Sequence, residues 1–401
     1  MNEIVVSEAY SASNLGDLEL VRQSVNVVSA TTDSDFYLVA VHPDSFPDLG
    51  QRLALPRIFD RLEYRKRSGA ARAALIMSWG LRLAVLSFIA IVPSLSARRR
   101  LAGLFPNAAV RAYARSRRVV AVGGGYIGDQ YRAETLLVAW TWWWSCRVVG
   151  QVETMPISYE IDNPRLGRVF ARLAKNVTMS ARDSASHRRM ATHGLEARLI
   201  PDLAFLNARP SAGSVSGGHE PDRYFVSLVG RDYLDPRQLD RVVDNVVATL
   251  ERAGASSVGL VAMHAPLGNS GIGADWEALD VLAARLRSAD IGSSRVVVDS
   301  YGELIDVLAG GRALIAARMH AGIAGLCAGL PVMLLAYEDK HFAMARDRGL
   351  EQHCIDIRSE RELFVNCFGR TMATDASVFA NSASEAKRHV QRAFGPGAAR
   401  A

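Results

Sequence analysis

The stretch "RALIAARMHAGIAGLCAGLPVMLLAYEDK", residues 312–340, decides the fold because it holds a strand, a helix and a second strand in succession. The apolar run at 312–317 predicts a buried strand, and the small residues at 321–329 predict a short helix. The apolar residues after Pro331 predict a second buried strand. Continuous apolar strands joined through a helix are typical of parallel sheets that are covered on both faces.

The same alternation of strand and helix extends over most of the chain. Helical patterns separate the apolar or alternating runs, for example at 235–254, which ends at a glycine. We expect further strands at 3–10, 35–41, 117–125 (running into a glycine turn), 147–152, 176–183, 224–230, 257–264, 294–300 and 352–357, and residues 197–206 close the first half. This order indicates an α/β fold with parallel sheets and helices on both faces.

A segment rich in glycine, serine and proline, residues 207–222, interrupts this pattern and predicts an interdomain linker. Residues 1–206 are then an N-terminal α/β domain and residues 223–381 a second one, followed by a terminal helix and loose tail at 382–401. Two consecutive Rossmann-like domains place a cleft between the carboxyl ends of their strands, where such sheets bind ligands.

Composition narrows the kinds of partner. The net charge of +6 and the pI of about 9.3 suit an anionic small molecule or a membrane surface, whereas no nucleic-acid-binding motif is evident. The four cysteines show neither a pairing pattern nor metal-ligand spacing, which predicts reduced thiols and no metal site. No signal peptide is evident at the N-terminus, so we expect a cytoplasmic protein.

The apolar segment at 73–95 is about as long as a membrane span, and three arginines follow it at 98–100. Arg82 near its middle makes a true span costly. We favour one or two helices buried in the domain. The alternative is a helix lying on the inner face of the membrane, with residues 73–100 as a peripheral contact.

Arg318 and His320 stand where the strand of the opening stretch ends and its helix begins. A helix N-terminus offers free backbone N–H groups and the positive end of the helix dipole. The arginine fork adds a receptor for carboxylate or phosphate, so we predict an anion-binding site with Arg318 as its clamp. An internal salt bridge is the alternative, but no acid occurs within the apolar run. His320 beside a bound polyanion is a candidate general acid.

Two loops of the first domain are expected to face the same cleft. The loop after the first strand carries Asn14, Gly16 and Asp17, and the turn "VGGGYIGDQ" carries Gly124 and Gly125. Neither has the spacing of a dinucleotide or nucleoside-triphosphate loop. Either loop is equally well interpreted as a tight turn.

Two further arginines stand at the ends of predicted strands. Arg231 follows the strand at 224–230 and is a second candidate anion clamp. Arg182 stands next to Asp183 after the strand at 176–183, where an internal ion pair is the simpler interpretation.

The order of these motifs resembles the polysaccharide pyruvyl transferase family along nearly the whole chain. The segments that carry the resemblance are "NLGDLEL" (14–20), "VVAVGGGYIGD" (119–129), "ARDSAS" (181–186), "PDLAF" (201–205) and the R-x-H, G-x-P and Y-x-x-K elements of 317–340. The sequence departs from the family at 153–164, where a Q-x-I-G-P-like element is usual, and this departure points to an unusual acceptor.

The resemblance implies two domains of the glycosyltransferase-B type and transfer of a pyruvyl group from phosphoenolpyruvate to two hydroxyls of one sugar. The product is a cyclic ketal on a polysaccharide, lipid-linked repeat unit or glycolipid. Arg318, Arg231, Asn14, Gly16, Gly124, Gly125 and Lys340 are then substrate-binding residues. His320 is the general acid, and Asp17 is our candidate base. Phosphoenolpyruvate is the donor substrate, and no cofactor is implied.

Two other functions compete with this one. A glycosyltransferase that uses a nucleotide sugar predicts an acidic ribose ligand in the helix at 321–330, which has no acid. A non-catalytic relative that binds glycolipid or membrane through 73–100 predicts that Arg318 is dispensable, and the intact R-x-H element argues against it.

Overall fold

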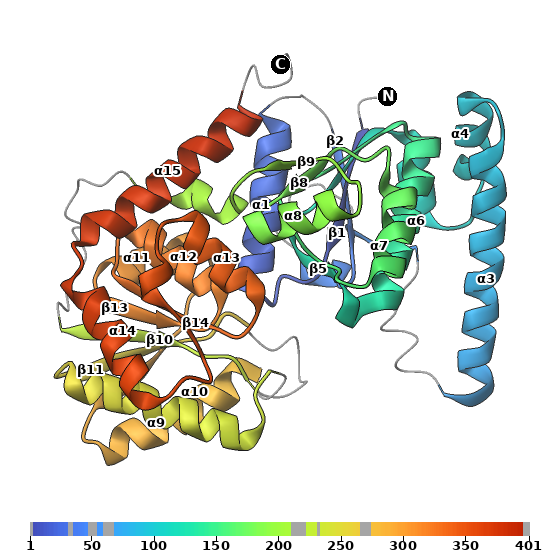
Figure 1. Cartoon of the computed structure of the whole chain (residues 1–401). Helices are drawn as coiled ribbons and strands as arrows, with labels where there is room; N and C mark the ends of the chain where they lie inside the picture. The colour runs from blue at the N-terminus through green and yellow to red at the C-terminus, as the bar shows by residue number, and fades with distance from the viewer. Residues whose placement is uncertain are drawn as a thin grey trace.

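The chain folds around parallel sheets covered by helices (Figure 1). The computed structural model describes residues 3–30, 35–46, 54–58, 68–209, 222–230, 233–264 and 274–395. The first sheet has the order β3-β2-β1-β4-β6, with all pairs parallel. Its strands are β1 (Glu3–Ala9), β2 (Asp35–Ala40), β3 (Ala54–Pro56), β4 (Ser116–Ala121) and β6 (Gln151–Thr154).

A small parallel sheet of order β5-β7-β8-β9 extends the first one, and an isolated bridge between Glu153 and Thr178 connects the two. Its strands are β5 (Gly124–Gly128), β7 (Ile157–Glu160), β8 (Met179–Ala181) and β9 (Ala197–Leu199). The strand expected to run into a glycine turn at 117–125 ends as β4 at Ala121, and the turn region contains the further strand β5. Gly124 has a φ of +140°, a conformation that favours glycine, and it redirects β5 to pair with β7.

The second sheet has the order β12-β11-β10-β13-β14-β15 and is also parallel throughout. Its strands are β10 (Arg223–Ser227), β11 (Ser257–Val261), β12 (Gly292–Val296), β13 (Ala313–Ala316), β14 (Val332–Ala336) and β15 (Cys354–Asp356). The prediction of two Rossmann-like parallel sheets is confirmed. Strand order reverses beside β1 in the first sheet and beside β10 in the second, and α/β sheets bind ligands at such switch points.

Helices cover both faces of the sheets (Figure 1). The first half contains α1 (Leu15–Ser29), α3 (Gly69–Ile91), α4 (Leu95–Gly103), α5 (Ala108–Arg115), α6 (Arg132–Val148), α7 (Pro164–Ala174) and α8 (Ser184–Thr192). The second half contains α9 (Pro236–Arg252), α10 (Ala274–Ser288), α11 (Tyr301–Ala309), α12 (Met319–Ala328), α13 (Asp339–Asp347), α14 (Arg361–Ala373) and α15 (Ala376–Phe394). The strand expected at 147–152 begins only at Gln151, because α6 continues through Val148.

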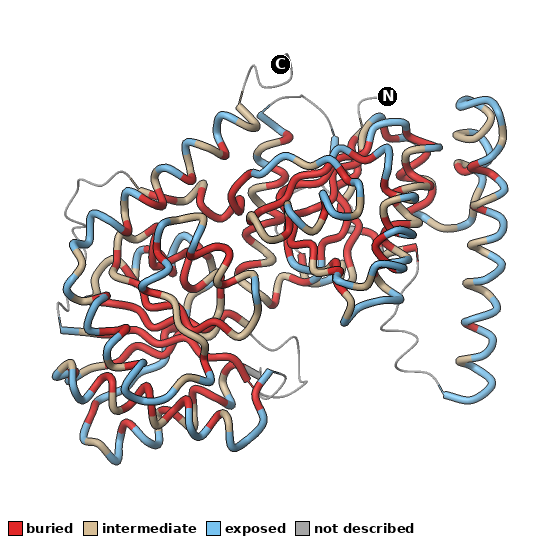
Figure 2. The backbone as a smooth tube through the Cα atoms, in the orientation of Figure 1, coloured by how far each residue is buried: buried red, intermediate tan, exposed pale blue. Residues whose placement is uncertain are grey.

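α3 corrects the expectation of a buried helix at 73–95. It stands at the edge of the molecule, and most of its length is exposed (Figures 1 and 2). Only Leu75, Leu86, Ile89 and Ala90 are buried, because a single face packs against α6. By length and composition the helix could cross a membrane. Only 22% of its most apolar 18-residue segment is buried in the protein.

Several contacts among the described residues join the two halves of the molecule, including those of α1, α8 and α15. The amide of Leu15 at the start of α1 donates to the carbonyl of Met263 beyond β11, at 2.9 Å. Arg189 on α8 forms ion pairs with Asp162 at 2.8 Å and with Asp339 on α13 at 2.6 Å. α15 packs on both halves. These contacts hold the switch points of the two sheets opposite one another.

Candidate functional site

A cavity of about 540 Å³ lies where the two switch points meet. The first half of the chain supplies most of its walls, including Asn14, Asp17, Gly124 and Gly125. The second half closes it with Tyr233, His264 and Arg318. The structure therefore brings five of the sequence-predicted residues to one cavity.

The first turn of α1 carries three of the predicted residues. Asn14 is the N-cap, and its side-chain oxygen accepts from the amides of Gly16 at 2.9 Å and Asp17 at 3.2 Å. Gly16 lies directly against His320, since a Cβ added to it would be 2.2 Å from the Nδ1 atom of that ring. Only glycine allows this approach. Burial raises the pKa of the Asp17 carboxyl, and the nearby His320 and His264 rings lower it only in part.

His320 faces a buried carboxylate that the sequence analysis did not identify as a site residue. Its Nε2 atom lies 3.6 Å from Asp202, which is an ion-pair distance for a protonated ring. Arg182 donates to the same carboxylate at 3.0 Å and to the Ser158 hydroxyl at 2.7 Å. Burial opposes ionisation of Asp202, but His320 and Arg182 outweigh it and hold the pKa well below its usual value. Arg182 thus pairs with Asp202, whereas Asp183 caps α8.

Arg318 has an internal acid partner, contrary to the expectation that a ligand must supply one. Its guanidinium donates through Nε to both carboxylate oxygens of Asp275, at 3.0 and 3.2 Å. Asp275, on the first turn of α10, is fully buried and also accepts from the amides of Met263 and His264. The Arg318 guanidinium lies 5.1 Å from the centroid of the Tyr233 ring. Arg318 still lines the cavity, so Asp275 orients the guanidinium without removing it from the site.

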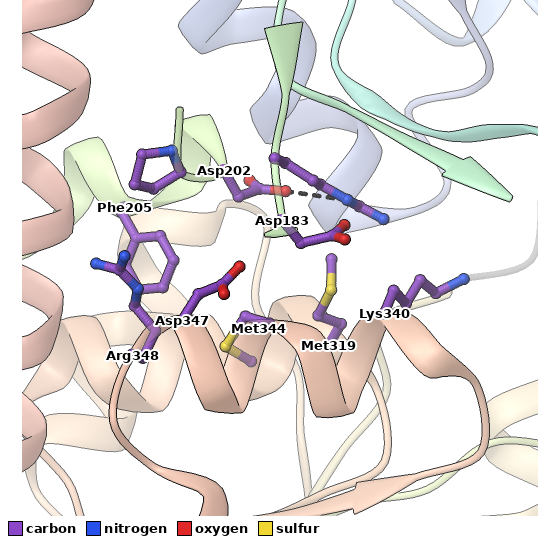
Figure 3. A pocket seen from close by; sticks show the side chains of 10 residues that line it. Asp183, Asp202, Phe205, Met319, Lys340, Met344, Asp347 and Arg348 are labelled. Carbon is purple, nitrogen blue, oxygen red and sulfur yellow. Dashed lines mark hydrogen bonds and ion pairs between the residues drawn. The ribbon is translucent and has the colours of Figure 1, made fainter. Parts of the chain in front are cut away.

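Lys340 lies opposite the glycine turn. A Cβ added to Gly125 would be 3.1 Å from Arg182 and 3.7 Å from the Lys340 ammonium. Lys340, on the first turn of α13, pairs with the N-cap residue Glu338 and lies 3.7 Å from Glu160 across the domain interface. Figure 3 shows Lys340 and Asp202 at the border of one small pocket. Lys340 therefore lies beside the glycine turn, with Glu338 and Glu160 as its acidic partners.

Arg231, the second predicted clamp, lies outside the described residues, and its role stays a prediction. Among the described residues, no group of three histidine, cysteine, aspartate or glutamate side chains could hold a metal ion.

An ion pair at the end of β1 is a further feature that the sequence analysis missed. Glu8 and Arg57 lie 3.0 Å apart, and both line the cavity. Burial raises the pKa of the Glu8 carboxyl, with Arg57 lowering it in part. Glu8 also has a φ of +67°, which is rare for a residue with a side chain and is typical of functional sites. Only its place in an apolar strand, as the one carboxylate in 4–9, could have drawn attention to it.

Comparison with known proteins identifies related sequences and folds. The family model described as polysaccharide pyruvyl transferase matches residues 94–339, more than half of the chain. No curated protein matches the sequence.

Solved structures share the fold at low sequence identity. UDP-GlcNAc 2-epimerase from Methanocaldococcus jannaschii is 11% identical with a TM-score of 0.53, covering 98% of this chain and 99% of its own. Sucrose-phosphate synthase from Thermosynechococcus elongatus is 11% identical with a TM-score of 0.54, covering 98% and 95%. A putative UDP-N-acetylglucosamine 2-epimerase from Listeria monocytogenes is 9% identical with a TM-score of 0.54, covering 98% and 95%. These neighbours show that the fold is of the glycosyltransferase-B type.

Proposed function

The chain belongs to the polysaccharide pyruvyl transferase family, and we propose that it moves the enolpyruvyl group of phosphoenolpyruvate onto two hydroxyls of one sugar, forming a cyclic pyruvate ketal. The observation that carries this proposal is that Arg318 and Asp17 line one cavity at the two switch points, while His320 packs against Gly16, the neighbour of Asp17. Phosphoenolpyruvate carries close to three negative charges, which arginines and the N-terminus of α12 are suited to bind. The acceptor is a glycan, free or attached to a lipid.

In the proposed reaction, protonated His320 gives its proton to the methylene carbon of the donor, which becomes a methyl group. A sugar hydroxyl attacks the cationic carbon next to it and loses its proton to Asp17. A second hydroxyl of the same sugar then displaces phosphate, and its proton leaves with the phosphate. Proton transfers of this kind typically contribute about 10²–10⁴ to the rate. The reaction as proposed needs no cofactor.

The roles of the charged partners follow from their contacts. Asp202 lies within ion-pair distance of His320 and orients the ring that serves as the acid in the proposed reaction. Asp275 fixes the plane of the Arg318 fork, which suits two-point binding of a carboxylate or phosphate. Both carboxylates are buried and come from the domain interior, so they are positioning residues.

Calorimetry with phosphoenolpyruvate tests the donor site. Removing Arg318 alone would leave Asp275 buried without its partner, so the variant is the pair Arg318→Ala with Asp275→Asn, beside Asp275→Asn alone. Losing a charge-assisted contact costs about 1.5–3 kcal/mol, or roughly tenfold to more than a hundredfold in affinity. We expect that loss in the double variant and near-normal binding in His320→Ala.

A nucleotide sugar is the informative competitor, because the fold is shared with enzymes that act on such compounds. If the wild-type protein binds a nucleotide sugar and no phosphoenolpyruvate, the proposed pyruvyl transfer is wrong. The chain would then be a glycosyltransferase that uses a nucleotide sugar.

A further inference from the structure

The outward face of α3 is apolar from Ile76 to Ile91. Its large side chains are exposed by 38–69%: Ile76, Met77, Leu81, Val85, Phe88 and Ile91. From Ile76 to Ile91 this face measures about 22 Å at 1.5 Å per residue. A contiguous apolar surface of this kind on a folded protein marks an interaction site.

The charge around this helix identifies the partner. Residues 68–115 contain seven arginines and no aspartate, glutamate, lysine or histidine, whereas the whole chain has a net charge of only +6. Four of these arginines donate to backbone carbonyls, and no carboxylate of the described residues pairs with them: Arg82, Arg98, Arg99 and Arg111. An apolar helix within a region of positive charge is complementary to an anionic lipid surface.

We propose that α3 lies in the interface of an anionic lipid bilayer, with its outward face inserted among the headgroups. The helix does not need to cross the bilayer. Its inward face packs against the rest of the protein, where Leu86 and Ala90 are fully buried. Arg82, in the middle of the helix, points inward and donates to the carbonyl of Ile58 at 3.2 Å.

The same helix is joined to the wall of the cavity. Ile58, the partner of Arg82, lines the cavity, as do Leu137 and Thr141 on α6. α3 packs on α6, and the indole of Trp140 donates to the Ser87 hydroxyl at 3.2 Å. Lipid docking therefore places the cavity next to the membrane. The docking rests on α3 alone and does not depend on the proposed reaction.

Vesicle flotation of the full chain tests the docking. The probes are vesicles of phosphatidylcholine alone and of phosphatidylcholine with phosphatidylglycerol. The variant combines Leu81→Glu with Phe88→Glu, and the matched control is Leu363→Glu, which changes a leucine that is 54% exposed on α14. We expect the wild type and control to float with the anionic vesicles, and the double variant to float at least about tenfold less. Raising the ionic strength to about 1 M, where the Debye length is about 3 Å, should reduce the wild-type binding.

Three results overturn the proposal. The wild type can fail to float, or the double variant can float as well as the control. The third is a wild-type dimer in solution that the double variant converts to monomers without any vesicle binding, which assigns the face to a second copy of the chain. Phosphoenolpyruvate calorimetry on the double variant keeps the two proposals separate, because donor binding does not use this face.

Discussion

At the scale of single residues, the position of Asp17 makes the most direct prediction about chemistry. It lines the cavity, next to the turn that packs on His320. Asp17→Asn keeps the shape of the side chain but removes the proposed base, so we expect kcat to fall by about 10²–10⁴ while donor binding is retained. Asp240→Asn, at a carboxylate that is 58% exposed on α9, is the control.

The pH dependence of the rate separates a base from a structural residue. Burial raises the pKa of Asp17, and a base works only when ionised, so the wild-type rate should rise with pH through a value above the ordinary pKa of about 3.9. Steady-state kinetics measured across this pH range should show the rise of the rate with pH in the wild type and in Asp240→Asn. If the rate of Asp17→Asn still rises with pH in the same way, another group is the base.

Single residues also show what the sequence could and could not predict. Arg318 and His320 were found because polar side chains at the end of an apolar strand stand out in the sequence. Their acidic partners did not stand out in the sequence. Asp275 is 43 residues from Arg318, and Asp202, the partner of His320, lies in the other half of the molecule. Apolar patterning records burial along one element, but it contains no information on which distant acid meets a given arginine.

At the scale of elements, the glycines of α12 hold the site helix close to its sheet. A Cβ added to Gly325 would lie 2.7 Å from Leu314 and 2.8 Å from Val332 on the strands below. We predict that Gly325→Ala destabilises the protein by about 1–3 kcal/mol through overpacking. Gly369→Ala on α14 meets nothing within 4 Å and should stabilise by roughly 0.5–1 kcal/mol. Chemical denaturation of the two variants measures this difference, and effects of equal sign would contradict it.

Elements differ in how far the sequence determined them. The apolar run that became β13 was predicted to within one residue at each end, because strands buried on both faces have a continuous apolar pattern. α3 is equally apolar but is exposed on one face, so composition alone gave the wrong environment. Its outward residues do not differ in type from its inward ones. Only the packing on α6 distinguishes the two faces.

At the scale of the whole molecule, α15 joins the two halves. Phe379, Ala383 and Ala386 pack into the core of the second half, and Val390 packs into the core around β1 in the first half. The ammonium of Lys387 also donates to the carbonyl of Ala208, at 2.6 Å, where the first half ends. The sequence suggested a terminal helix from 382, but its length of 19 residues and its bridging position depend on tertiary packing.

Replacing Val390 should therefore uncouple the halves. Val390 is fully buried, and Val390→Asp places an unpaired carboxylate in an apolar core, which is among the substitutions that cost more than about 4 kcal/mol. Val378→Asp on the same helix is the control, because Val378 is 41% exposed. We expect calorimetry to show one unfolding transition in the wild type and control. The Val390→Asp variant should show a separate, lower transition of the first half. A single unshifted transition would mean that the interface at α1 and α8 couples the halves without α15, since that interface does not involve Val390.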